Sequence, residues 1–410
     1  MLVCKSRLIE LLNDEDERVV NIAAEALERF FYDSEGIIAI FLAILEKENQ
    51  REHPRELAFA HRIRSFSATE EEVQFIPSLL VNLQDKEEDD ESEELAWNLE
   101  IKLLETPFLL LEKHRRLFAS NRKLMNIYEK ARMWDKFRLM PPDDLWQLFE
   151  RQFEHSFKEG EADRHEFVHM LVNLLVQQGD AIKPHVLSHL KNRYIDDENM
   201  DLFLVEMAGR LKLIEATPFL FAILRDSDPL DIIHQDCIRY IGMLGTVELV
   251  KTIERLYIMD EELRAELAEI LGQIPHSYSE DLCIKLLEKE NDTFLKTYFA
   301  GSLCNLFSLK GSEWIVDTIR KRRYDPFVLN LFDRLIPVYA YHKVSPQGLE
   351  ELERSDLQFR KGILESSEFD FEVEDDDDED DDETGFGDGE DDDEEGNDES
   401  DDSPKNCSFL

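Results

Sequence analysis

Residues 8–30 read LIELLNDEDERVVNIAAEALERF, a pattern that predicts two helices joined by a short polar turn. The first helix ends in leucines up to Leu12, and apolar residues after the turn recur at the spacing of one helix face. Asp14 and Asp16 stand where a side-chain oxygen caps the free amides of the second helix. A single helix pair cannot bury its apolar face alone, so we expect further pairs to stack beside it.

The same helix pair returns at a fixed period between residues 181 and 340. The equivalent apolar positions are separated by 34, 32, 31 and 32 residues and are Leu190, Leu224, Leu256, Leu287 and Ile319. A period of this length indicates a helical repeat array. Residues 37–104 hold two further units, one with a helix entered through Pro54 and one with an acidic loop, Asp85–Glu94. We therefore expect one long curved rod of stacked pairs.

Prolines, turn aspartates and small residues recur in phase through these units. We expect Pro77, Pro184 and Pro218 each to open a first helix, where proline costs no hydrogen bond. The other recurring positions are Asp14, Asp226, Leu263-Arg264, Leu295-Lys296, Ala23, Ala26, Ala268 and Ala300. In these features the chain resembles HEAT repeats of the armadillo-like superhelix class, in their short bacterial form. The resemblance implies a right-handed α-solenoid. The first unit departs from the family pattern at Val20, where HEAT repeats carry a basic residue.

Changes in the repeat pattern divide the chain into five segments. We expect N-terminal HEAT-like repeats at 1–104, an irregular basic helical segment at 105–140, a regular HEAT-like array at 141–345, a capping helix at 346–365 and a disordered acidic tail at 366–410. The last repeat helix is expected at Pro326–Ile336. No sustained period-two alternation occurs before residue 368, so the predicted fold class is all-α.

The chain is strongly acidic, with a net charge of −46 over 410 residues. From Gly362 onward there are 25 acids and one lysine, so the end of the chain carries −24 and the remainder −22. A field of this sign repels polyanions and disfavours nucleic acid as a partner. Between Glu372 and Asp402, 22 of 31 residues are acidic, which predicts disorder. Such a tail either only keeps the protein in solution or makes electrostatic contact with a basic partner.

Residues 111–140 form a basic exception, with nine lysines and arginines against three acids. Aromatic residues are interleaved with them, and they are Phe118, Tyr128, Trp134 and Phe137. Basic and aromatic side chains together bind single-stranded nucleic acid, although in helices they more often make one charged face and one core face. Our hypothesis is that the acidic tail folds back on segment 111–140, or on the basic cluster Arg320–Arg323.

One motif carries candidate chemistry. His165-Glu166-Phe167-Val168-His169 matches H-E-x-x-H, in which two histidines bind zinc and the glutamate activates a metal-bound water. Both histidines are expected to point away from the apolar stripe of their helix. No strand-rich subdomain precedes the motif, and no third ligand stands at a recognisable spacing, the nearest downstream glutamate being Glu198. We interpret the motif as a chance match and assign no catalytic, cofactor or metal residue.

The cysteines and the chain ends favour a soluble cytoplasmic protein. The cysteines show no C-x-x-C pair and are Cys4, Cys237, Cys283, Cys304 and Cys407. Neither a signal peptide nor an apolar run of membrane length is apparent, and we expect no membrane contact. Cys407 begins a C-a-a-X prenylation pattern, but the acidic residues before it oppose docking on an anionic membrane. Asp391–Asp402 partly matches a calcium loop without its flanking helices.

These observations predict a non-catalytic scaffold. We expect the inner helix face of the solenoid to hold a protein partner, and the acidic body favours a basic or amphipathic segment. Two other classes stay open. One is an enzyme, either a zinc-dependent hydrolase at His165, Glu166 and His169 or, as the resemblance implies, a lyase of the kind found in some short-HEAT families. The other is an acidic-tail chaperone for basic proteins.

Overall fold

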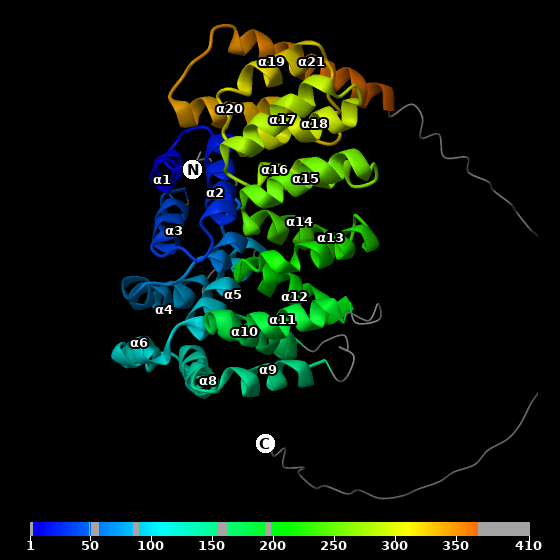
Figure 1. Cartoon of the computed structure of the whole chain (residues 1–410). Helices are drawn as coiled ribbons and strands as arrows, with labels where there is room; N and C mark the ends of the chain where they lie inside the picture. Colours follow the sequence, from blue (N-terminus) through cyan, green and yellow to red (C-terminus); the bar gives the residue numbers. More distant parts are fainter. Residues whose placement is uncertain are drawn as a thin grey trace, which may run out of the picture. The chain divides into compact units, whose positions relative to one another are not determined.

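The computed structural model describes residues 3–48, 50, 57–84, 90–153, 162–192 and 198–367. These residues form 21 α-helices and three short 3-10 helices and contain no β-strand (Figure 1), so the all-α prediction is confirmed. None of the described helices combines the length and apolar character needed to cross a membrane. Residues 1–362 form one compact unit and residues 363–410 a second. The acidic run from Glu368 onward, including Cys407 and the calcium-like pattern, lies outside the described residues.

The N-terminal part contains five α-helices and one 3-10 helix. They are α1 (Lys5–Leu11), α2 (Glu17–Phe30), α3 (Ile37–Glu48), η1 (His61–Ser65), α4 (Glu70–Gln84) and α5 (Asp90–Glu105). Asp16 caps α2 as predicted, because its Oδ1 accepts a hydrogen bond of 2.9 Å from the Arg18 amide. Asp14 accepts one of 3.0 Å from the Asp16 amide and fixes the turn between the first two helices.

Two predictions for this part are wrong in detail, and a third lies outside the described residues. Pro77 lies inside α4, because a capping box starts that helix at Glu70. Thr69 Oγ1 accepts from the Glu72 amide over 3.2 Å, and Glu72 Oε2 accepts from the Thr69 amide over 2.7 Å. Helix α5 begins at Asp90, so the second half of the predicted acidic loop is helical. Residues 51–56, where a helix entered through Pro54 was expected, lie outside the described part, and only the 3-10 helix η1 follows them.

The remaining helices follow in order along the chain. They are α6 (Phe108–Lys113), α7 (Arg115–Phe118), α8 (Arg122–Arg138), α9 (Pro142–Arg151), α10 (Ala162–Gln177), η2 (Gly179–Ala181), α11 (Lys183–Lys191), α12 (Glu198–Arg210), η3 (Ile214–Ala216), α13 (Thr217–Asp226), α14 (Ile232–Leu244), α15 (Val247–Met259), α16 (Arg264–Gly272), α17 (Ser277–Lys289), α18 (Thr293–Asn305), α19 (Ser312–Arg320), α20 (Leu331–His342) and α21 (Leu349–Ser367). Pro184 and Pro218 stand in the first turns of α11 and α13, as predicted. The helix expected at Pro326–Ile336 begins instead at Leu331, where Asn330 caps it, and continues through Pro337.

The second helices of consecutive pairs pack directly on one another. Helix α12 contacts α14, α14 contacts α16, α16 contacts α18 and α18 contacts α20. The crossings are close because glycine recurs there. A Cβ added at Gly242 would lie 2.5 Å from Gln273 Cβ, and one at Gly272 would lie 2.8 Å from Ser302 Cα. The alanines expected to allow close approach, Ala23, Ala26, Ala268 and Ala300, are all buried.

The helices at the inside of this arrangement form a closed circuit of contacts. Helix α2 contacts η1, η1 contacts α5, and α5 contacts α8. Trp134 and Phe137 of α8 lie against Phe167 of α10, which contacts α12. The circuit closes because α20 contacts α2, and Figure 1 shows the blue N-terminal helices beside the green and yellow ones. The expected long curved rod is therefore wrong, because α20 near the end of this unit contacts α2 near its start.

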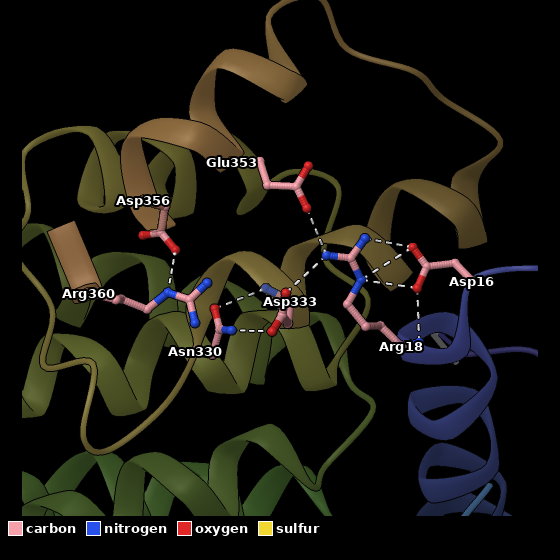
Figure 2. Close-up of polar contacts among 7 residues, drawn as sticks. All are labelled: Asp16, Arg18, Asn330, Asp333, Glu353, Asp356 and Arg360. Carbon is pink, nitrogen blue, oxygen red and sulfur yellow. Dashed lines mark hydrogen bonds and ion pairs between the residues drawn. The ribbon is translucent and has the colours of Figure 1, made fainter. Parts of the chain in front are cut away.

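Ion pairs hold the place where the ends meet, as Figure 2 shows. The Arg18 guanidinium of α2 donates to Asp333 of α20 over 3.0 Å and to Glu353 of α21 over 3.1 Å. It also donates to Asp16 of its own chain turn over 2.7 Å. Nearby, Arg334 Nη1 of α20 donates to Glu25 Oε2 of α2 over 2.8 Å. The contacts of α2 with α20 and α21 join residues more than 300 positions apart, so no local pattern predicts them.

Candidate functional site

Two adjoining cavities lie between the N-terminal helices and the array that follows. The larger, here called the central cavity, has a volume of about 570 Å³ and is lined by residues of α2, η1, α5, α10, α12 and α14. The smaller, here called the tryptophan cavity, has a volume of about 400 Å³ and is lined by η1, α5, α8 and α10. Arg64, Glu105 and His169 line both. Volumes of this size suit small organic ligands.

Opposite charges from the two sides meet in the central cavity. Arg239 of α14 donates to Glu28 Oε1 of α2 over 2.7 Å, and Arg210 of α12 lies 3.5 Å from the Asp33 carboxylate. Both guanidiniums also lie over the Tyr32 ring, at 5.3 and 5.7 Å from its centroid. Arg239 is thus neutralised by an N-terminal carboxylate, whereas Arg210 pairs with Asp33 and, over 2.7 Å, with Glu206 of its own helix. This pairing makes the central cavity a polar contact between the two parts of the fold.

Several groups in the central cavity have shifted pKa values. Burial raises the pKa of Asp236 to about 6, even though Arg239 nearby acts in the opposite direction. Burial also acts to raise the pKa of Glu206, but the positive charge of Arg210 outweighs it and the pKa lies below its usual value. Burial raises the pKa of Tyr32 far above its usual range. Shifts of this kind occur in functional sites and in structural ion-pair networks, and the pairing here fits the second.

The H-E-x-x-H residues lie on α10 at the wall of the tryptophan cavity. The His165 and His169 rings are 4.5 Å apart between centroids, and Phe203 of α12 packs against both. Burial, together with the neighbouring Arg64 charge, lowers the pKa of His169 to about 4. Burial and the same arginine lower the pKa of His165. Both imidazoles are therefore neutral at pH 7, and within the described chain neither has a hydrogen-bond partner.

The arrangement around this motif does not fit a zinc hydrolase. Glu166 Oε2 accepts a hydrogen bond of 2.6 Å from Lys130 Nζ, whereas the glutamate of such an enzyme must face a metal-bound water. Among the described residues, no three His, Cys, Asp or Glu side chains are grouped so that they could hold a metal ion. The side chain of Glu198 lies outside the described part. We derive no chemical step through a metal.

The basic segment 111–140 is largely occupied by contacts within the fold. Lys113 pairs with Glu70 over 2.9 Å, Lys123 with Glu100 over 3.6 Å, and Lys130 with Glu166 as above. The interleaved aromatics Phe118, Tyr128 and Trp134 are buried. Bases cannot stack on buried rings, so the segment follows the pattern of one charged face and one core face. The predicted contact with the acidic tail lies outside the described residues.

A surface that the sequence analysis missed runs along the turns between the two helices of three consecutive pairs. We call it the turn ridge; its apolar residues are Leu230, Ile232, Ile258, Met259 and Phe294. Between 43% and 93% of each of these residues is exposed. Acidic residues surround them and are Asp226, Asp228, Asp231, Asp260, Glu261, Glu262, Glu290 and Asp292. The signal in the sequence was apolar residues that continue past the buried stripe into an acidic turn.

Contacts between neighbouring turns show that the ridge is continuous. Arg225 Nε at the end of α13, just before the first turn, donates to Asp260 Oδ2 in the second turn over 3.2 Å. Tyr257 beside the second turn donates its hydroxyl hydrogen to Glu290 in the third. Within the first turn, Asp228 Oδ1 accepts from the Leu230 amide over 2.9 Å and holds that turn in place. The apolar side chains of the ridge therefore lie on one edge of the array, with an excess of acids.

Three of the four described cysteines are buried and unreactive, whereas Cys4 is exposed and a hydrogen bond with Ser6 lowers its pKa. Cys237, Cys283 and Cys304 are buried, and no disulfide joins any of the described thiols. Burial raises the pKa of Cys304 to about 12, and that of Cys283 rises for the same reason. Thiols in such surroundings are poor nucleophiles.

No protein-family profile matches this chain, and no curated protein and no solved structure is significantly similar to it.

Proposed function

We propose that the protein is a non-catalytic HEAT-like scaffold that binds a basic, amphipathic segment of a partner protein on the turn ridge. The observation that carries this proposal is the repetition of one surface in three consecutive helix pairs. Each pair exposes one or two large apolar side chains at the same turn, among acids. An exposed apolar surface rimmed by polar groups is typical of an interaction site.

The arrangement of helices supports the solenoid part of the proposal. Second helices stack in sequence order, and glycines or alanines stand at their crossings, as stacked HEAT pairs require. The inner face, where a partner was expected from the sequence, is in contact with α2 at α14 and at α20. The turn edge carries no such cover from the described residues. We therefore place the partner on this edge instead of the inner face.

The geometry of the ridge limits the length and chemistry of the partner. Stacked helices are about 10 Å apart, so three turns span about 20 Å, or about 13 residues of partner helix. Full burial of one large apolar side chain contributes about 1.5–3 kcal/mol, part of which offsets the cost of association. The acids favour lysine and arginine beside the apolar anchors and raise the rate of encounter. A basic amphipathic helix satisfies both requirements.

Site-specific photocrosslinking in the native source tests the proposal. A photoreactive phenylalanine at Ile258 should capture peptides that combine basic residues with large apolar ones, identified by mass spectrometry. In the matched control the photoreactive phenylalanine replaces Leu139, which is 86% exposed, follows the end of α8 and lies outside the ridge. Equal capture at both positions, or capture of acidic peptides at Ile258, would contradict the proposal.

Charge reversal then separates a specific ridge from general acidity. Glu261→Lys with Glu262→Lys should abolish binding of the captured segment. Glu350→Lys with Glu351→Lys on α21 changes net charge equally at two other exposed acids and should leave binding unchanged. Deleting residues 368–410 distinguishes the scaffold from the alternative of an acidic-tail chaperone. If tail deletion abolishes binding and the ridge variants do not, the acidic tail is the binding element and the scaffold proposal fails.

A further inference from the structure

The tryptophan cavity has one positive charge that no carboxylate of the described chain balances. Each carboxylate in its wall has a cation: Glu100 pairs with Lys123, Glu105 with Lys102, and Glu166 with Lys130. Arg64 has no such partner, and its guanidinium lies over the Trp97 ring at 4.8 Å from the centroid. By contrast, Arg138, Arg210 and Arg239 in the neighbouring central cavity all donate to oxygen acceptors.

Aromatic side chains line the cavity around the Arg64 guanidinium. Trp97 of α5 is 50% exposed, and Trp134 of α8 lines the same cavity. The imidazoles of His165 and His169 complete the wall on α10, and each offers a ring N–H or a ring nitrogen lone pair without a partner. An exposed indole beneath an arginine, with unpartnered imidazoles beside it, is a set of groups that suits a planar ring bearing an acidic substituent.

We propose that the tryptophan cavity binds a small planar aromatic anion, with its carboxylate or phosphate on Arg64 and its ring against the exposed Trp97. The guanidinium presents paired N–H donors that match two oxygens of such a group. The imidazoles supply further hydrogen bonds. The cavity volume of about 400 Å³ holds a ligand of two or three fused rings. This site is separate from the turn ridge, and binding there does not depend on a protein partner.

Fluorine NMR of the full chain labelled with 5-fluorotryptophan locates the site directly. The chain has four tryptophans, so the spectrum has four resonances, assigned by single tryptophan-to-phenylalanine substitutions. The probe is 2-naphthoate, with 2-naphthol as the uncharged comparison. Naphthoate should shift the Trp97 and Trp134 resonances with saturation and leave Trp146 and Trp314 unchanged. Naphthol should bind at least about tenfold more weakly, because a charge-assisted hydrogen bond is lost.

A charge variant tests the role of Arg64. Arg64→Gln should weaken naphthoate binding by about ten- to a hundredfold and leave naphthol binding unchanged. Arg116→Gln, which removes an exposed arginine elsewhere on the surface, should bind naphthoate as the unaltered protein does. The Arg64 side chain makes no hydrogen bond in the described fold, so its substitution should not alter folding, and circular dichroism checks this. Naphthoate that shifts all four resonances alike or none, or that binds Arg64→Gln equally well, would overturn the proposal.

Discussion

Replacing Arg18 by alanine should loosen the contact between the two ends of the helix array. Arg18 is 35% exposed, and its partners Asp333 and Glu353 are 39% and 46% exposed. Solvent therefore screens each pair to about 0.2–1 kcal/mol. The partly exposed Arg18 guanidinium also lies 5.9 Å from the centroid of the buried Phe332 ring, a cation–π contact worth about 0.5 kcal/mol. The sum is a loss of about 1–2.5 kcal/mol at this contact.

Hydrogen exchange measured by mass spectrometry shows where this loss acts. A loss of about 1.4 kcal/mol makes local opening about tenfold more frequent, so exchange in α1, α2 and α20 should rise by about that factor. Exchange in α14 and α16 should not change, because the apolar side chains of these helices pack away from Arg18 and its partners. Arg132→Ala is the control, since Arg132 is 60% exposed and pairs with Glu129 of its own helix.

Two outcomes of this experiment would refute the reasoning. One is that exchange in α1, α2 and α20 of Arg18→Ala rises no more than exchange in α8 of the control Arg132→Ala. The other is a double-mutant cycle of Arg18→Ala and Asp333→Ala with no coupling energy, since residues in contact couple and distant residues do not. Either result would mean that the ends do not meet through Arg18.

Three further predictions concern the core, the central cavity and the tail. Gly272→Ala should destabilise the fold by about 1–3 kcal/mol in urea denaturation, because the new methyl meets the Ser302 backbone, whereas Gly362→Ala on α21 meets nothing and should be neutral or stabilising. Burial raises the pKa of Asp236 to about 6, so the folded state keeps a proton that the unfolded chain releases, and stability falls as pH rises from about 4 to above 6. The free energy of unfolding of Asp236→Asn should therefore exceed that of the unaltered protein by about 1–3 kcal/mol at pH 8 and equal it at pH 4. The same difference in denaturation midpoint between the two proteins at both pH values would contradict this. Deleting residues 368–410 should leave the thermal midpoint unchanged at the same ionic strength, and a large loss would show that the tail stabilises the body.

The sequence was a good guide where local chemistry decides the structure. The cap at Asp16 and the first-turn prolines of α11 and α13 depend on residues a few positions apart, and they stand where predicted. Pro77 shows the limit of such reasoning. Glu72 both completes the capping box of α4 and accepts a hydrogen bond of 2.6 Å from the Ala39 amide of α3, so a long-range contact helps to fix where the helix begins.

The candidate sites depend on contacts that periodicity does not encode. Arg18 and Asp333 are 315 residues apart, so no repeat pattern indicates that the array closes. Arg64 and His169 come from separate helices, and only the fold brings them to one cavity. The turn ridge was within reach of the sequence, because Ile258 and Met259 follow the buried stripe of α15 and are exposed just before an acidic turn.

Chemical crosslinking of the unaltered protein tests the closed circuit most directly. Lys5 at the start of α1 and Lys343 at the end of α20 lie on the two sides of the contact, since Lys343 pairs with Glu10 of α1 over 2.9 Å. A short amine-reactive crosslinker should join Lys5 to Lys343 in the monomer isolated by size exclusion. Absence of that crosslink from the monomer, while lysines within the array still react with each other, would contradict the closed arrangement.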